Sequence, residues 1–121
     1  MRVISVLNLK GGVAKTFTAA NVAYELYRRG YRVLLIDNDK QGNLSKAYSR
    51  YDAENIAPVT KLLAGDWCNV DELIQHTDYE GIDIVTANMS LFGATWNLTK
   101  EDSENPVSYT HLRAHETVLD L

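Results

Sequence analysis

The sequence has one cysteine, Cys68, and no long uninterrupted apolar run. A single cysteine excludes an internal disulfide and a cysteine-based metal cluster, and this composition suits the cytoplasm. No apolar stretch approaches the roughly eighteen residues that a helix needs to cross a bilayer. The first residues lack the long apolar core and the small-residue cleavage site of a signal peptide. We therefore expect a soluble, cytoplasmic protein.

A strong charge of one sign is also missing. The formal net charge is −4 at pH 7, which gives no overall attraction to nucleic acid or to an anionic membrane. The shares of hydrophobic residues, 45%, and of charged residues, 23%, are ordinary for a globular domain. At 121 residues the chain has the length of one domain, long enough to bury roughly two-thirds of its unfolded surface.

The first part of the chain has the pattern of a strand, a helix and a second strand. Residues 2–7 are mostly apolar, which predicts a strand buried on both faces between two helical layers. Residues 16–29 predict a helix that Gly30 ends. Residues 32–36 predict a second buried strand with Asp37 at its carboxyl end. A right-handed crossover makes two such strands parallel, so both carboxyl ends lie at one edge of an α/β sheet.

The remaining residues predict shorter elements. We expect helices at 43–50, 59–63 and 91–98, a further helical turn at 71–75 with Asn69 as its cap, and a third strand at 82–87. Residues 101–106 are polar and predict a linker.

A glycine-rich loop joins the first strand to the first helix, and residues 10–16 read KGGVAKT. Gly11 and Gly12 allow a tight turn that points successive N–H groups at an anion. Lys15 would reach the outer phosphates of a nucleotide, and the Thr16 hydroxyl would bind Mg²⁺. The N-terminal end of the helix adds its partial positive charge to the same place. The loop therefore predicts nucleotide binding.

The segment KGGVAKT resembles the deviant Walker A motif of the ParA/MinD group of ATPases, which carries a second lysine before the glycine pair. Residues 33–43, VLLIDNDKQGN, resemble the Walker A′ segment of ParA-type partitioning ATPases. The resemblance implies an α/β fold, the three-layer α/β/α P-loop NTPase with a mainly parallel sheet. It covers residues 1–100, the N-terminal part only of that fold.

The resemblance also implies a role for each site residue. Lys10 would reach the phosphates of the partner across a nucleotide-sandwiched dimer, although a solvated loop cation is the alternative. Asp37 would hold a water bound to Mg²⁺ and Asp39 would orient the attacking water, the alternative being a polar turn with Asx-type hydrogen bonds. Phe17 would offer its N–H to the α-phosphate while its ring packs against the sheet. The implied catalytic residues are Lys10, Asp37 and Asp39, and the implied metal ligands are Thr16 and Asp37. The implied nucleotide-binding residues are Lys10, Gly11, Gly12, Val13, Ala14, Lys15, Thr16 and Phe17.

For the whole protein, the resemblance implies a partitioning ATPase that segregates plasmids or chromosomes. Such proteins bind Mg·ATP, form an ATP-dependent homodimer, hydrolyse the nucleotide slowly, and act with a ParB-like partner and nonspecific DNA, without a membrane. The alternatives are a MinD-like positioning ATPase that acts at a membrane, and a truncated frame without function.

The end of the chain departs from this pattern. Residues 107–121 resemble a translated adapter sequence, so we expect residues 101–121 to be a linker and a non-native tail. The family's next element is a buried strand that ends in an acidic residue, the Walker B strand, and we expect the chain to lack it. His111 and His115 have helical spacing but no third ligand, which argues against a metal site. The fragment is therefore expected to be weak or inactive as an ATPase.

Overall fold

The computed structural model describes residues 2–6, 12–93 and 117–120. In chain order, the elements are β1 (Val3–Val6), α1 (Gly12–Arg28), β2 (Val33–Asp37), α2 (Asn43–Ala47), α3 (Pro58–Ala64), the 3₁₀ helix η1 (Val70–Leu73), β3 (Gln75–His76), β4 (Ile82–Val85) and β5 (Thr117–Asp120).

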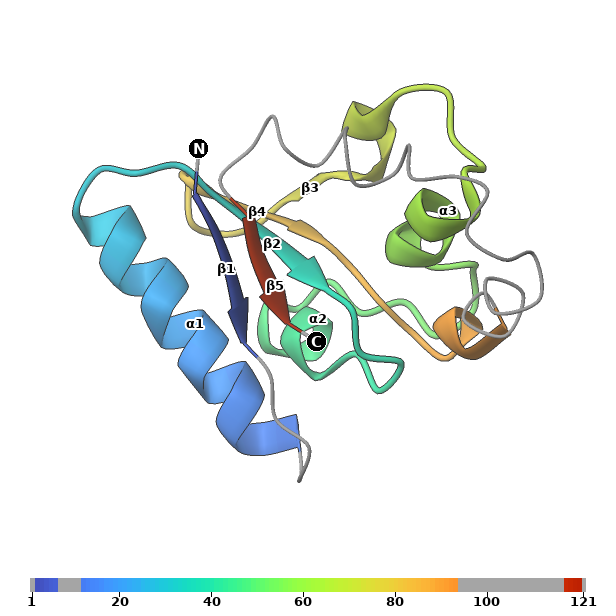
Figure 1. Ribbon diagram of the computed structural model, residues 1–121, viewed down its shortest axis with the longest axis horizontal. Helices are drawn as coiled ribbons and strands as arrows, with labels where there is room; N and C mark the ends of the chain where they lie inside the picture. Colours follow the sequence, from blue (N-terminus) through green and yellow to red (C-terminus); the bar gives the residue numbers. More distant parts are fainter. Residues whose placement is uncertain (1, 7–11, 94–116, 121) are drawn as a thin grey trace.

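The strands form one sheet in the order β1-β5-β2-β4-β3 (Figure 1). The pairs β1–β5, β5–β2 and β2–β4 are parallel, and only β3 runs antiparallel to its neighbour β4. A mainly parallel sheet was predicted, and it is confirmed. Because β1, β5 and β2 run the same way, their carboxyl ends share one edge, and that edge also faces the start of α1 (Figure 1).

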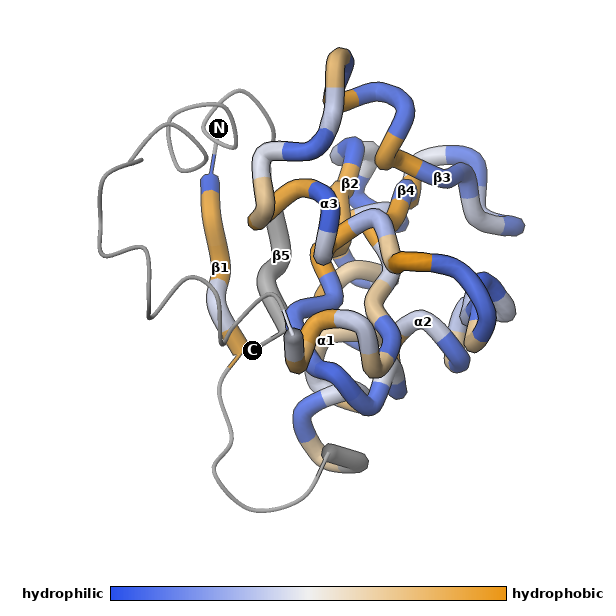
Figure 2. The backbone as a smooth tube through the Cα atoms, turned by 90° about the vertical axis from the view of Figure 1, so that its right-hand side faces the viewer, coloured by the Kyte–Doolittle hydropathy of each residue, from blue (hydrophilic) through white to orange (hydrophobic). Residues whose placement is uncertain are grey.

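Helices cover both faces of the sheet. Alternate side chains of β2 point to opposite faces, so Leu34 and Ile36 pack with α3 and η1, while Val33 and Leu35 pack with α1. Leu35 is fully buried, and burying one such side chain contributes about 1.5–3 kcal/mol. Strands β1, β2 and β4 are coloured mostly as hydrophobic in Figure 2. The three-layer α/β/α arrangement is confirmed.

Helix α1 begins four residues earlier than predicted, at Gly12 rather than near Thr16. No proline interrupts residues 12–15, and alanine and lysine favour a helical backbone, so the first turn can wind directly out of the glycine pair. Ala19 and Ala23, one turn apart, are fully buried against the sheet. The helix ends at Arg28, one residue before the predicted end, and Gly30 follows it with a φ of 87°.

Strand β5 corrects the expectation that no further strand follows. Its four residues lie between β1 and β2, in register with both, and Asp120 pairs with Asp37 across the β2 ladder. An acidic residue therefore ends a strand beside β1, the place where the family's Walker B strand was expected. No strand was predicted for this segment because residues 107–121 resemble an adapter sequence, although Val118 and Leu119 form a short apolar run.

The prediction that β1 is buried on both faces is wrong. Val3 is 50% exposed and Ile4 is 38% exposed. In the part of the chain that the structure describes, β1 pairs with β5 alone and forms the outer edge of the sheet (Figure 2). An apolar strand sequence thus identifies a strand, but it does not tell how many layers cover it.

The shorter elements are close to the predictions. Helix α3 starts with Pro58 in its first turn and is capped by Gly65, and the Asn69 side chain caps η1 by accepting from the Asp71 N–H. The β4 strand is confirmed, whereas α2 ends at Ala47, three residues short of the prediction. Strand β3 has only two residues and was not predicted. Residues 90–93 are helical, and the rest of the helix expected at 91–98, the linker 101–106 and both tail histidines lie outside the described residues.

Candidate functional site at the carboxyl edge of the sheet

Two motifs far apart in the sequence meet through Lys15 and Asp39. Lys15 lies in the first turn of α1, and its Nζ donates to Asp39 Oδ2 at 3.1 Å. The Lys15 side chain is only 6% exposed and that of Asp39 18%. The fold thus brings together two side chains that lie 24 positions apart in the sequence.

Asp37 ends β2 with its side chain fully buried. Its Oδ1 accepts the Asp39 N–H at 3.2 Å. Its Oδ2 accepts both the N–H and the hydroxyl of Ser45, at 3.0 and 2.6 Å. Three donors thus hold a carboxylate that would be very costly to bury alone.

Ser45 is the site residue that sequence reasoning missed. It lies in α2, is fully buried, and its Oγ also accepts the Ala87 N–H at 2.9 Å. The available signal was a small hydroxyl residue two positions after the Walker A′ segment. A serine at such a place is common on solvent-exposed helix starts as well, so sequence alone did not distinguish it.

Asp39 is held as an anion although it is partly buried. Burial by itself would raise its pKa, but the hydrogen bond from the Gln41 N–H and the Lys15 ammonium outweigh burial and lower the pKa below its usual value. The Gln41 N–H donates to Oδ1 at 3.0 Å, which leaves Oδ2 to Lys15. Each aspartate therefore accepts from the N–H two residues on, so the Asx-type turn predicted as the alternative is present together with the ion pair.

The turn between β2 and α2 depends on Gly42. Its φ of 66° is in the left-handed region, and its N–H donates to Asp39 O at 2.9 Å. A Cβ at this position would meet Tyr51 ring carbons at 2.6 and 2.7 Å and Ala87 O at 2.8 Å. A side chain there would push on the segment that positions Asp37 and Asp39.

The Thr16 hydroxyl is the candidate protein ligand for a metal ion. Its Oγ1 is buried and has no hydrogen-bond partner among the described residues, whereas the Thr18 hydroxyl, half a turn on, donates to Ala14 O at 2.8 Å. A buried hydroxyl without a partner costs free energy. Mg²⁺ prefers oxygen ligands, one or two from protein and the rest from water and phosphate. The residues present therefore fit Mg²⁺ bound to a nucleotide.

The other predicted site residues are placed as follows. Lys10 and Gly11 lie outside the described residues. Gly12 and Val13 form the first turn of α1 with Ala14, which is exposed. The prediction that the Phe17 ring packs against the sheet is wrong, because the side chain is 69% exposed. The stripe of α1 that faces the sheet contains positions 15, 19 and 23, and position 17 is about 200° away from 15 at about 100° per residue.

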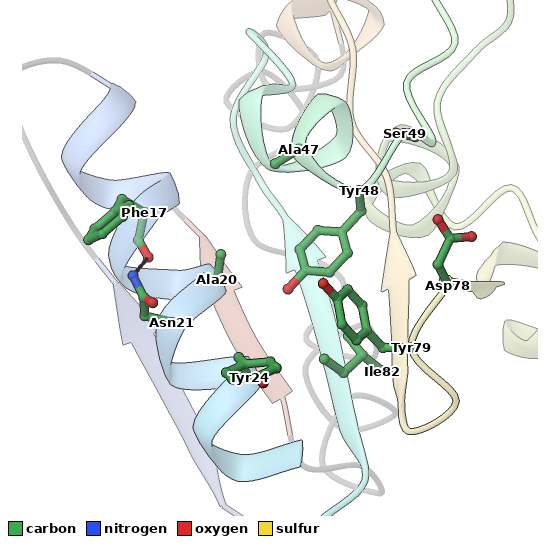
Figure 3. A pocket seen from close by; sticks show the side chains of 10 residues that line it. All are labelled: Phe17, Ala20, Asn21, Tyr24, Ala47, Tyr48, Ser49, Asp78, Tyr79 and Ile82. Atoms are coloured by element: carbon green, nitrogen blue, oxygen red, sulfur yellow. Dashed lines mark hydrogen bonds between the residues drawn. The ribbon is translucent and has the colours of Figure 1, made fainter. Parts of the chain in front are cut away.

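A cavity of about 430 Å³ lies between α1, the end of α2 and the β3–β4 turn. Phe17, Asn21 and Tyr24 line it from α1, and the Tyr48 and Tyr79 side chains point toward them (Figure 3). The Tyr79 ring contacts the Tyr24 and Tyr48 rings edge-on, with centroids 6.2 and 6.3 Å apart. Burial, and then the neighbouring Tyr79, raises the pKa of Tyr48 to about 12.

Within the residues that the structure describes, no group of three His, Cys, Asp or Glu side chains is arranged to hold a metal ion. Within the same residues, no helix has the length and apolar character needed to span a membrane.

Comparison with known proteins gives a family. The model of the AAA_31 family, described as an AAA domain, matches residues 1–121. The chain is 38% identical over 93 residues to the chromosome partitioning protein ParA of Caulobacter vibrioides, which covers 77% of this chain and 34% of that protein. The chain spans about a quarter to a third of the length of the curated relatives it matches.

Solved structures share the fold. A cobyrinic acid a,c-diamide synthase from Mycobacterium smegmatis with bound ADP and magnesium has a TM-score of 0.84 and 32% identity, over 99% of this chain and 50% of that one. The septum site-determining protein MinD from Pyrococcus horikoshii, complexed with Mg-ADP, has a TM-score of 0.72 and 26% identity, over 98% of this chain and 47% of the MinD chain. With its P-loop fold and its two motifs meeting at one sheet edge, the chain belongs to the AAA domain family and is of the ParA type.

Proposed function

We propose that this chain binds Mg·ATP at the carboxyl edge of the sheet and that, within a longer protein, it hydrolyses the nucleotide. The observation that carries the proposal is the pairing of a buried Lys15 with Asp39 beside the unpartnered hydroxyl of Thr16. A buried ammonium and an unpartnered oxygen at the start of one helix suit an anion accompanied by a divalent cation. Similar solved structures contain an ATP analogue or ADP with magnesium.

Each residue has a defined task in this proposal. Lys15 exchanges Asp39 for the outer phosphates, and the N–H groups of residues 11–17 hold the phosphate oxygens. Thr16 binds Mg²⁺ directly, and Asp37 accepts a hydrogen bond from a water in its shell. The metal, when bound, neutralises charge on the transferring phosphoryl group. Asp39, released from Lys15, orients the attacking water, and Lys10 serves the partner's nucleotide in an ATP-dependent homodimer.

For the whole protein we propose a partitioning role. The relative in Caulobacter vibrioides is a chromosome partitioning protein, and the Gln41-Gly42-Asn43 sequence after the acidic pair favours this branch. A ParB-like partner, nonspecific DNA as the substrate for movement, and a cytoplasmic location belong to the same proposal. A MinD-like positioning ATPase is the second candidate, supported by the fold shared with the archaeal MinD structure.

We further propose that residues 1–100 are the ATPase part of the chain and that residues 101–121 are a linker and a non-native tail. The tail resembles an adapter sequence, and the four residues of β5 occupy a place that a native strand of the longer protein would otherwise take.

Thermal unfolding with Mg·ADP and Mg·ATP tests nucleotide binding. Ligand at a hundred times its dissociation constant should stabilise the chain by about 2.7 kcal/mol. Lys15→Ala should abolish the stabilisation, whereas Lys61→Ala, which removes an exposed lysine of α3, should retain it. An unchanged melting temperature of the folded wild-type chain at millimolar nucleotide, or an equal shift in Lys15→Ala, would show that the proposal is wrong.

A further inference from the structure

We propose that Ser45 is a positioning residue for the magnesium side of the nucleotide site, acting through Asp37. The inference rests on the proposed function and deepens it. Its basis is the contact geometry of one fully buried serine that touches the ends of two strands at once.

The Ser45 hydroxyl is fixed in both of its hydrogen-bonding roles. It donates to Asp37 Oδ2 at 2.6 Å and accepts the Ala87 N–H at 2.9 Å. The N–H of the same serine donates to the same Oδ2 at 3.0 Å. Two donors from one residue hold that oxygen, so the carboxylate plane has little freedom to turn.

This arrangement links three elements at the edge of the sheet. Asp37 ends β2, Ala87 lies two residues beyond the end of β4, and Ser45 belongs to α2. Because β2 and β4 are neighbouring parallel strands, the serine sets both the orientation of Asp37 and the spacing between the two strand ends. The remaining oxygen of Asp37, Oδ1, accepts the Asp39 N–H at 3.2 Å, so the effect of Ser45 extends to the second aspartate.

Loss of the hydroxyl has a consequence that water does not repair. Ser45 and Asp37 are both 0% exposed, so Ser45→Ala leaves the Ala87 N–H without its acceptor and Asp37 Oδ2 with one donor fewer. A hydrogen bond to a charged group is among the stronger ones in proteins. We therefore expect Asp37 to lose its fixed orientation while Lys15, which makes its hydrogen bond with Asp39, still binds phosphate.

The test is the ratio of ADP affinities measured with Mg²⁺ and with EDTA, by calorimetry on the complete chain. Ser45→Ala should lower this ratio about tenfold, the size expected for one hydrogen bond to a carboxylate, and should change ADP affinity in EDTA by less than about twofold. A merely structural defect would weaken ADP binding equally under both conditions and leave the ratio unchanged. Ser45→Thr, which keeps the hydroxyl, should restore the ratio.

Ser90→Ala is the matched control. The Ser90 hydroxyl accepts the Ala57 N–H at 3.0 Å and pairs with the Thr60 hydroxyl at 2.8 Å, so its removal also breaks two hydrogen bonds in the interior. It makes no contact with Asp37, and the ratio should equal that of the wild type. If Ser45→Ala does not fold, Ser45→Cys, nearly isosteric but a weak donor and acceptor, should show the same tenfold fall.

Two further measurements separate the explanations. In an Asp37→Asn background, Ser45→Ala should leave the ratio unchanged, because a residue that acts through another shows no effect of its own once the other is altered. Hydrogen exchange at the Ala87 amide should quicken in Ser45→Ala without any nucleotide. A folded Ser45→Ala chain that binds ADP with the wild-type ratio, or a ratio that still falls in the Asp37→Asn background, would overturn the inference. Absence of ADP binding by the wild-type chain is a distinct result, which refutes the proposed function and this inference with it.

Discussion

Replacing Asp39 with asparagine is expected to destabilise the nucleotide-free protein and to strengthen its binding of Mg·ADP. In the structure, the Asp39 carboxylate lies 3.1 Å from the Lys15 ammonium. The substitution removes the negative charge but keeps an oxygen that accepts the Gln41 N–H. Phosphate and Asp39 compete for the same ammonium, so the two effects have opposite signs.

The size of the effect follows from the burial of the pair. Exposed ion pairs contribute about 0.2–1 kcal/mol, and breaking a fully buried pair costs about 3–5 kcal/mol. Lys15 is 6% exposed and Asp39 is 18% exposed, so this pair lies between these cases, at about 1–2 kcal/mol. The melting temperature of a domain of this size should then fall by about 4–8 °C. Relief of about 1 kcal/mol of competition raises the affinity for Mg·ADP about fivefold.

Differential scanning fluorimetry without nucleotide and calorimetric titration with Mg·ADP measure the two effects. Asp66→Asn is the control, because Asp66 is exposed and its carboxylate makes no hydrogen bond or ion pair with the residues that the structure describes. It should change neither quantity. An Asp39→Asn chain that binds Mg·ADP no better than the wild type would refute the idea that Asp39 occupies Lys15 until phosphate displaces it.

Three other substitutions or deletions have definite expected results. Gly42→Ala should lower the free energy of unfolding by about 2–4 kcal/mol in a denaturant titration, because the added Cβ would overlap the Tyr51 ring. Gly65→Ala is the control, since Gly65 also has a positive φ, of 72°, but has nothing within 4 Å of an added Cβ, and it should cost only about 1 kcal/mol. Equal losses of stability in the two variants would contradict the overlap. Burial raises the pKa of Tyr48 from its ordinary value of 10.0 to about 12, so the stability that this group contributes is present below pH 10 and lost as the pH rises toward 12. The stability of Tyr48→Phe should depend less steeply on pH in that range, and an unchanged slope would contradict this. A chain ending at residue 106 lacks β5 and should aggregate on gel filtration, because β1 loses its partner and β2 gains an open edge; a monomeric, cooperatively unfolding product would show that β5 is not needed to close the sheet.

The sequence predicted the elements in which local pattern and tertiary role agree. Two apolar runs separated by a glycine loop and a helix predicted β1, α1 and β2, and the end of the helix within two residues of Gly30 followed from the freedom of glycine at positive φ. Asn69 was identified as a cap because its side chain satisfies a helix N–H whatever surrounds it. These features depend on neighbours in the sequence, so they can be derived without the fold.

Features that depend on distant neighbours were not predicted correctly. The burial of β1 depends on what lies beside it in the sheet, and Val3 is exposed although its sequence suits a core strand. Phe17 lies on the side of α1 away from the sheet, and an apolar side chain near the start of a helix does not by itself tell which face of the helix is packed. The Ser45 hydroxyl accepts a hydrogen bond from the N–H of Ala87, which is 42 residues away in the sequence. No short-range sequence pattern signals such a contact.

The two carboxylates of the Asp37–Asp39 turn differ in environment, and the difference indicates separate tasks. Asp37 is fully buried and accepts three hydrogen bonds from two residues of the chain, so moving it would disrupt the ends of β2 and the start of α2 together. Asp39 is partly exposed and is held by Lys15 and the Gln41 N–H, and a phosphate can replace it at the ammonium without leaving a buried charge unpaired. We infer that Asp37 stays in place to fix the site, while Asp39 is the carboxylate that changes partner when nucleotide binds. The positions of the two aspartates in the chain fit these separate tasks. Asp37 ends the buried strand β2 and is therefore immobile, whereas Asp39 lies in the turn beyond the strand and has room to move.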